Sequence, residues 1–147
     1  PDIYSKCGMN CSRCPWSRYT HETFKTDEDF QRFRDRCKKI LGYKPMEKPC
    51  LTCHTPDEEL PKGSRLPPRN CLVRQCATKT GIQNCAYCSR FPCGHVKDLG
   101  TEWTRGKFEE KHKAPISEED YITFIEPFEA LRHLEEIRTS LSPEDIV

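Results

Sequence analysis

The sequence predicts a small, irregular, mostly α-helical domain of the zinc-finger-like class, cross-linked through its cysteines and followed by a C-terminal helical extension. Of the eleven cysteines among 147 residues, ten lie in closely spaced groups between residues 7 and 93. Leu, Ile, Val and Phe contribute only 27 residues, so the apolar core is small and needs cross-links. Apolar residues recur at helical spacing only in short segments, separated by a proline-rich loop.

The clearest helix is predicted over residues 27–41. Thr26 is followed three places later by an acidic residue, which is typical of a capping box, and Gly42 stands where a helix-ending glycine belongs. Between them Phe30, Phe33 and Cys37 recur at helical spacing. Because Cys37 lies on this apolar face, we expect it to be a buried thiol rather than a metal ligand.

The middle of the chain is predicted to be mainly loop. Residues 43–70 contain six prolines, which interrupt both helices and sheets. Two short helices are predicted beyond it, over residues 72–79 and 94–99, ended by Gly81 and Gly100. Residues 101–114 are charged and lack periodicity, so a linker or an extended segment is expected there.

The last part of the chain is predicted to be helical and acidic. Ser117 can cap a helix that begins at residue 118, and Pro127 should break or restart it. An apolar stripe then follows, formed by Phe128, Leu131, Leu134, Ile137 and Leu141. This stripe either packs on the cysteine-rich part, which we favour, or docks a partner protein. We therefore divide the chain into a cysteine-rich domain, residues 1–100, and a charged linker with an amphipathic helical tail, residues 101–147.

The cysteine spacing points to metal ligation. CxxC pairs place two thiolates on one turn, where they can hold one metal ion or cluster. The candidate ligands are Cys7, Cys11, Cys14, Cys50, Cys53, Cys71, Cys76, Cys85, Cys88 and Cys93. A disulfide framework is the alternative, but the odd cysteine count and the repeated CxxC spacing favour metal ligation. Because free thiolates persist in a reducing compartment, we expect the protein to be cytoplasmic. No signal-peptide pattern and no apolar run long enough to span a membrane are present.

The sequence leaves the grouping of these ligands open. Radical-SAM enzymes hold a [4Fe–4S] cluster with the CxxxCxxC spacing found at residues 7–14, although this chain is too short for their barrel. Because Pro15 follows the run, it also resembles the cluster-binding loops of ferredoxins. It could instead give three ligands of a zinc site completed by Cys93. The CxxC pairs at 50–53 and 85–88 could form a four-cysteine site, with Cys71 and Cys76 completing either one. His54 and His95 are further candidates. No βαβ pattern supports a thioredoxin-like exchange site.

Charge is distributed unevenly along the chain. The formal net charge of +1 combines about +7 over residues 1–100 with about −6 over residues 101–147. A basic segment suggests a nucleic-acid-binding surface. However, each zinc ion held by four thiolates gives its site a net charge of −2, which offsets much of the positive charge of residues 1–100. We therefore do not expect nucleic-acid binding.

The order of motifs resembles a known family. CGxxCxxCP is followed by an amphipathic helix, a CxxC in a proline-rich loop, CLVRQCA at residues 71–77 and NCAYCSRFPC at residues 84–93. Over about residues 4–99 this is similar to the bacterial and archaeal cysteine-rich family called domain of unknown function 3795. The resemblance implies a small metal-binding domain without an established activity.

The residues and the resemblance lead to one expectation and one alternative. We expect a non-enzymatic module that holds two or more zinc ions and serves as a protein-interaction or accessory subunit, with a partner protein contacted through the helical tail. The alternative is a [4Fe–4S] protein that transfers electrons in an anaerobic redox enzyme. No acid, base or nucleophile is arranged in the sequence as a catalytic motif, so nothing in the sequence speaks for an enzyme.

Overall fold

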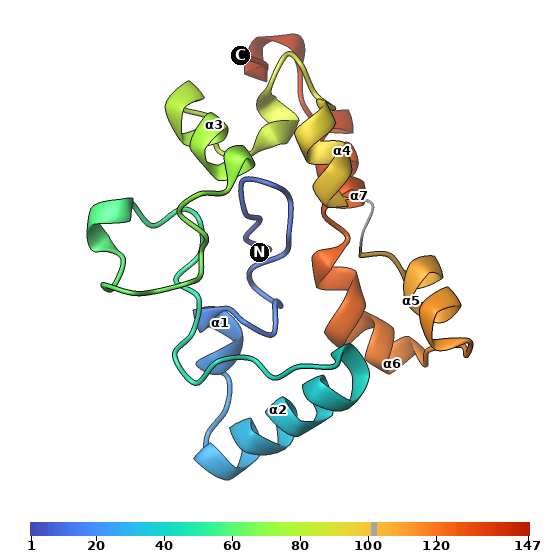
Figure 1. Cartoon of the computed structure of the whole chain (residues 1–147). Helices are drawn as coiled ribbons and strands as arrows, with labels where there is room; N and C mark the ends of the chain where they lie inside the picture. Colours follow the sequence, from blue (N-terminus) through green and yellow to red (C-terminus); the bar gives the residue numbers. More distant parts are fainter. Residues whose placement is uncertain (101–102) are drawn as a thin grey trace.

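The computed structural model describes residues 1–100 and 103–147. Its regular structure is helical, and over those residues the β-structure consists of two isolated bridges, Tyr4 with Asn10 and Ser17 with Cys50. Figure 1 shows the N-terminal segment in the middle of the molecule, between the loops that lead to α3 and the C-terminal helices. The predicted mostly helical class is thereby confirmed.

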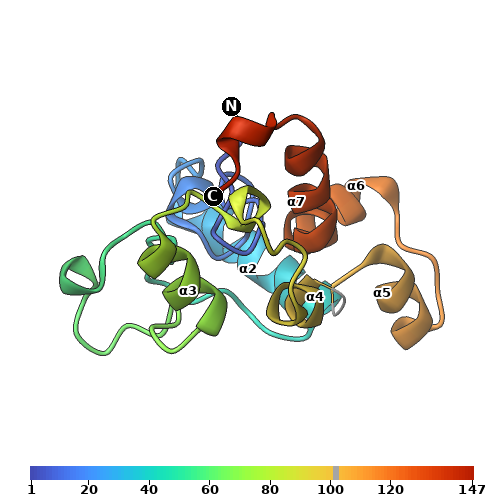
Figure 2. The same cartoon turned by 90° about the horizontal axis from the view of Figure 1, so that it is seen from above.

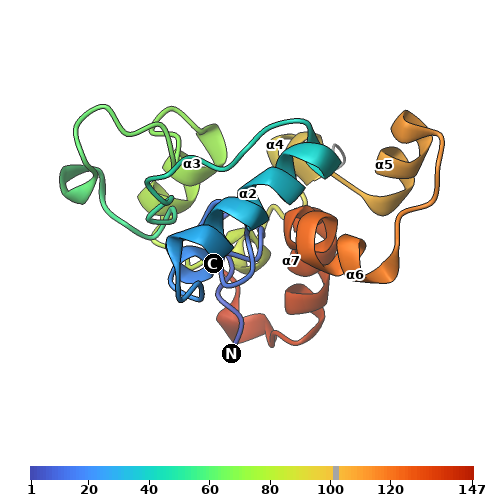
Figure 3. The same cartoon turned by 90° about the horizontal axis from the view of Figure 1, so that it is seen from below.

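Helix α2 (Asp27–Leu41) agrees with its prediction at both ends. The Thr26 side chain accepts a hydrogen bond from the Asp29 backbone N–H at 3.1 Å, and Gly42 ends the helix with φ of 93°. Figure 3 shows α2 beside the C-terminal helices. The Phe33 ring stacks on that of Phe124, with 5.6 Å between ring centroids. Cys37 is fully buried in this helix, as expected.

The remaining elements of the cysteine-rich segment are short. Helix α1 (Arg18–His21), which the sequence analysis did not predict, begins after Ser17, whose side chain accepts from the Thr20 N–H. Helices α3 (Leu72–Thr80) and α4 (Gly94–Gly100) match the predicted helices at 72–79 and 94–99. The long loop contains one 3₁₀ turn, η1 (Asp57–Glu59), and a second turn, η2 (Cys85–Tyr87), lies between α3 and α4.

The expectation of a linker or extended segment over residues 101–114 was wrong in its described part, residues 103–114. Helix α5 (Arg105–His112) forms there, with Thr104 accepting from the Lys107 N–H at 3.2 Å and Lys113 ending it at φ of 53°. None of its residues is buried. The helix is therefore stabilised mainly by its capping residues. It has no apolar stripe, so hydrophobic periodicity gave no sign of it in the sequence. In Figure 2 it lies at the periphery.

The tail is a broken helix. Ser117 caps α6 (Glu118–Asp120), accepting from the Asp120 N–H at 3.2 Å, as predicted. The chain continues through a π-helical turn, η3 (Tyr121–Ile125), and a 3₁₀ turn, η4 (Glu126–Phe128), that contains Pro127. Glu129 then leaves helical geometry with ψ of 63°, and α7 (Ala130–Thr139) begins, followed by η5 (Pro143–Asp145). Pro127 thus marks the interruption that the sequence predicted.

The tail and the cysteine-rich segment share one core. Its buried residues are Val73, Ala77, Ile82, Cys85, Ala86, Val96 and Leu134. Leu134 comes from α7 and is fully buried, while Leu131, Ile137 and Leu141 pack against the same cluster. The apolar stripe therefore packs against the cysteine-rich segment, the arrangement that the sequence analysis favoured. Binding of a partner protein through the tail stays a prediction. Among the described residues no helix combines the length and apolar character needed to cross a membrane.

Candidate metal centres

Six of the predicted ligands line one cavity of about 430 Å³. They are Cys7, Cys11, Cys14, Cys50, Cys53 and Cys71, here called the six-thiol group. Most of the other lining side chains are apolar or aromatic, among them Trp16, Leu66, Leu99, Trp103 and Phe128. A volume of this size falls within the range of ligand and cofactor pockets.

Backbone pairing brings the six-thiol group together. The Cys50 N–H donates to the Trp16 carbonyl at 2.7 Å, and the Arg18 N–H donates to the Cys50 carbonyl at 2.9 Å. This bridge places the CxxC of residues 50–53 beside the CxxxCxxC of residues 7–14. Cys71, which directly precedes α3, lines the same cavity.

Several of these sulfur atoms have hydrogen-bond donors directed at them. The Lys6 N–H donates to Cys53 Sγ and the Thr52 N–H to Cys50 Sγ, each at 3.4 Å, and the Ser5 hydroxyl lies 3.1 Å from Cys7 Sγ. Thr52 is buried and has φ of 76°, a conformation that an L-residue adopts at a cost. Donors of this kind stabilise a thiolate and tune the metal that it binds.

Burial opposes ionisation of these thiols as long as no cation compensates them. It raises the pKa of Cys7 to about 11 and that of Cys14 to about 12, and it also raises the pKa of Cys11. For Cys50 burial outweighs the Thr52 N–H and the positive charge of Arg74, so its pKa is raised as well. A free buried thiol in this state is a poor nucleophile. The raised pKa values therefore argue against thiol–disulfide exchange at these positions.

The other four predicted ligands line a second cavity of about 410 Å³. These four, here called the four-thiol group, are Cys76 in α3, Cys85 in η2, Cys88 directly after η2 and Cys93 directly before α4. Burial, with the neighbouring Cys7 and Cys93 thiols, raises the pKa of Cys85 to about 12. The Cys85 N–H donates to the Lys6 carbonyl at 2.9 Å, which joins this group to the first cysteine loop.

The two cavities divide the cysteines in a way that the sequence left open. The pairs at 50–53 and 85–88 line different cavities, as do Cys71 and Cys76, and Cys93 does not line the cavity of the N-terminal triad. His95 lines the second cavity. His54 lines neither cavity, and its Nε2 lies 2.6 Å from the Tyr4 carbonyl oxygen. Among the described residues, no three His, Cys, Asp or Glu side chains are arranged around a single metal-ion position. The thiols surround cavities, and their role as ligands stays a prediction.

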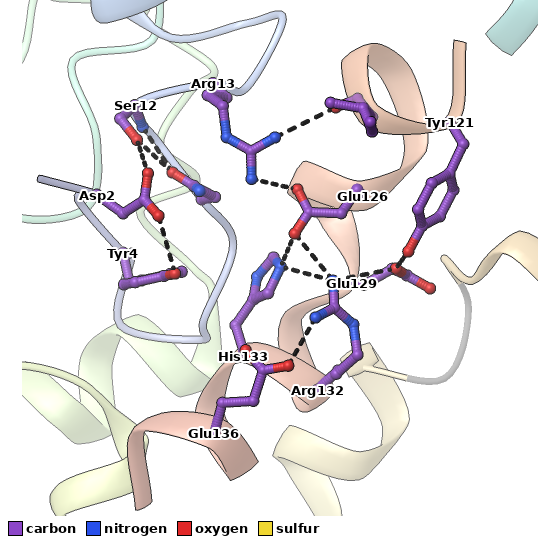
Figure 4. A network of polar contacts seen from close by, with 12 residues as sticks. Asp2, Tyr4, Ser12, Arg13, Tyr121, Glu126, Glu129, Arg132, His133 and Glu136 are labelled. Carbon is purple, nitrogen blue, oxygen red and sulfur yellow. Dashed lines mark hydrogen bonds and ion pairs between the residues drawn. The ribbon is translucent and has the colours of Figure 1, made fainter. Parts of the chain in front are cut away.

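The tail holds the first cysteine loop in place. His133 in α7 is buried, with Nδ1 at 2.7 Å from the Gly8 carbonyl oxygen and Nε2 at 2.9 Å from Glu126 Oε1 (Figure 4). Both ring nitrogens thus face oxygen atoms of other segments, and Arg132 Nη2 also lies 3.4 Å from Nε2. Arg13, within the CxxxCxxC run, pairs with Glu126 from the other side. The Asn10 N–H also donates to the Pro127 carbonyl at 2.8 Å.

Glu126 is the centre of this network. Burial on its own would raise the pKa of its carboxyl, but hydrogen bonds from His133 and Arg132 and the charge of Arg13 lower it below the ordinary value. Gly8 completes the contact, because a Cβ at this position would lie 2.4 Å from the Ala130 carbonyl oxygen. Sequence reasoning missed this network. The contacts of Gly8 and Arg13 with the tail join residues 125 and 113 positions apart, and the glycine after Cys7 was their only local signal.

Fold and site together define a small helical protein whose cysteines gather around two adjacent cavities. The comparisons with known proteins place it in a family. The profile of the family described as protein of unknown function DUF3795 matches residues 3–98, so the chain belongs to this family, as its motif order indicated. No curated protein and no solved structure matches the chain.

Proposed function

We propose that the protein binds metal through two cysteine-thiolate centres that hold its fold together. The observation that carries the proposal is the sorting of ten cysteines into groups of six and four around two cavities. Cys76, Cys85, Cys88 and Cys93 supply the four thiolates of a structural zinc site. The six-thiol group has enough ligands for two further zinc ions that share thiolates, or for a cluster.

On this proposal the metal replaces the apolar core that the cysteine-rich segment lacks. Zinc binding to such sites contributes on the order of 10 kcal/mol of folding free energy. The protein then acts as a cytoplasmic accessory subunit and not as an enzyme. The six-thiol cavity, whose lining beyond the thiols is mainly apolar, supports a metal that is held away from water.

A second candidate is favoured by one specific observation at the six-thiol group. Backbone N–H groups of Lys6 and Thr52 donate to Cys53 and Cys50, and this loop pairs with the CxxxCxxC run. Hydrogen bonds to sulfur and burial are the features that set the reduction potential of an iron–sulfur cluster. The second candidate is therefore an electron-transfer protein with a [4Fe–4S] cluster in this cavity.

Metal analysis of protein purified without oxygen tests both candidates. The expected result is two or more zinc ions per chain and no visible absorption; iron with matching acid-labile sulfide selects the second candidate. Cys85→Ser should remove the metal of the four-thiol group and destabilise the fold, and Cys11→Ser should remove that of the six-thiol group. Cys37→Ala is the matched control, since Cys37 lines neither cavity. A folded chain that carries neither metal overturns the proposal.

A further inference from the structure

The six-thiol cavity has a wall of one charge sign. Apart from the thiols, the charged side chains among its described lining residues are Lys6 and Arg74, both positive, and no carboxylate lines it. Two zinc ions with six thiolates, or a [4Fe–4S]²⁺ core with four, each carry a net charge of −2. A buried charge of this kind is costly unless an opposite charge lies beside it.

Arg74 has the features of such a partner. It lies in α3, its side chain is 7% exposed, and it lines the cavity. Two of its nitrogens are engaged: Nη1 pairs with Asp57, and Nη2 donates to the Thr55 carbonyl at 2.7 Å. Its Nε is buried and has no acceptor among the described residues. A buried N–H without an acceptor is unfavourable, so an acceptor is expected when the site is filled.

Lys6 differs from Arg74 in this respect. Its ammonium group donates to the Ile82 carbonyl at 3.0 Å, and its backbone N–H is already directed at Cys53 Sγ. The carboxylate of Asp57 that pairs with Arg74 is 61% exposed, so water screens its charge on that side. The guanidinium thus keeps most of its effect on the cavity.

We infer that the six-thiol cavity is built for an anionic metal–thiolate centre and that Arg74 is the counter-cation of that centre, with its Nε–H available to an acceptor of the bound group. The inference rests on the proposed function and deepens it, because it assigns the sign of charge that the site accepts. Arg74 is a positioning residue, since it acts on the metal through its charge and N–H and supplies no ligand atom.

The test is the rate at which anaerobically purified protein transfers its metal to an excess of chelator. The metal of the six-thiol group is identified as the fraction missing in Cys11→Ser. Arg74→Met should weaken its retention roughly 10- to 100-fold, the range for partners of metal ligands. Arg74→Lys should restore part of the loss, because it keeps the charge but not the planar group.

Two further variants separate this effect from a loss of packing. Arg138→Met is the matched control, since Arg138 also donates to backbone carbonyls, those of Ala86 and Cys88, but beside the other cavity. It should leave retention at the six-thiol group unchanged. Asp57→Asn should slow metal loss, because it removes the negative charge that partly neutralises Arg74. If Arg74→Met does not fold, the metal-loss rate of Asp57→Asn tests whether the charge of Arg74 retains the metal.

Three results overturn the inference: a folded Arg74→Met protein with wild-type retention, equal losses in Arg74→Met and Arg138→Met, or faster loss in Asp57→Asn. The proposed function fails in a different way, namely if Cys11→Ser leaves the metal content of the protein unchanged. The two failures are therefore distinguishable in one set of samples.

Discussion

Replacing Gly8 by alanine should loosen the contact between helix α7 and the first cysteine loop. Gly8 has φ of 98°, and a Cβ there would lie 2.4 Å from the Ala130 carbonyl oxygen and 2.5 Å from Leu134 Cγ. A positive φ costs an L-residue about 1–2 kcal/mol. Overpacking a buried contact costs about 1–3 kcal/mol more, and the backbone oxygen has little freedom to move. We expect a loss of about 2–5 kcal/mol in unfolding free energy.

Three other glycines provide the controls. Gly42 has φ of 93° with open space around it, so Gly42→Ala isolates the backbone cost of about 1–2 kcal/mol. A Cβ on Gly100 would lie 2.4 Å from Leu131 Cβ without a positive φ, so Gly100→Ala isolates a contact with α7 of about 1–3 kcal/mol. Gly106 has neither feature and lies in exposed α5, so Gly106→Ala should stabilise the protein by about 0.5–1 kcal/mol.

Thermal and urea unfolding of the four variants, compared at equal metal content, measures these differences. For a chain of this size Gly8→Ala should lower Tm by roughly 5–20 °C. If Gly8→Ala and Gly42→Ala lose the same stability, the close contact between the cysteine loop and α7 contributes nothing, and the assignment of the tail to the common core is refuted. A metal content that falls only in Gly8→Ala would show that the tail also supports the six-thiol group.

Three further predictions concern the core, the polar network and the isolated thiol. Leu134→Ala should cost about 2–5 kcal/mol in urea unfolding, because Leu134 is fully buried, and wild-type stability would contradict its place in the core. Glu126→Gln should cost about 1.5–3 kcal/mol at pH 7. The pKa of Glu126 is lowered in the fold, so the stability difference between Glu126→Gln and wild type should have its full size above the ordinary carboxyl pKa of 4.5. It should shrink as the pH falls below that value, and a difference that does not change with pH would refute the ion pair. Cys37→Ala should cost about 1 kcal/mol in stability and leave metal content unchanged, and a loss of metal would make Cys37 a ligand.

Local features could be read from the sequence because they depend on residues three or four places apart. Thr26 and Gly42 set both ends of α2, Ser117 set the start of α6, and Pro127 marked the break before α7. The thiol pairs were equally visible, since a CxxC spacing is itself a local geometry. Helix α5 was missed because an exposed helix without a buried face has no periodic signal.

The grouping of the thiols was decided only by the tertiary structure. The bridge between Ser17 and Cys50 places one CxxC beside the N-terminal run, whereas the other lines the second cavity. Loop paths of this kind follow from long-range backbone pairing, which spacing along the chain does not encode. The same holds for His133 on the Gly8 carbonyl and for Arg74 in the cavity wall, because each contact joins segments that meet only after the chain has folded. The sequence by itself determined the closely spaced thiol pairs and the local helices, and the fold determined which thiols share a cavity and what charge faces them.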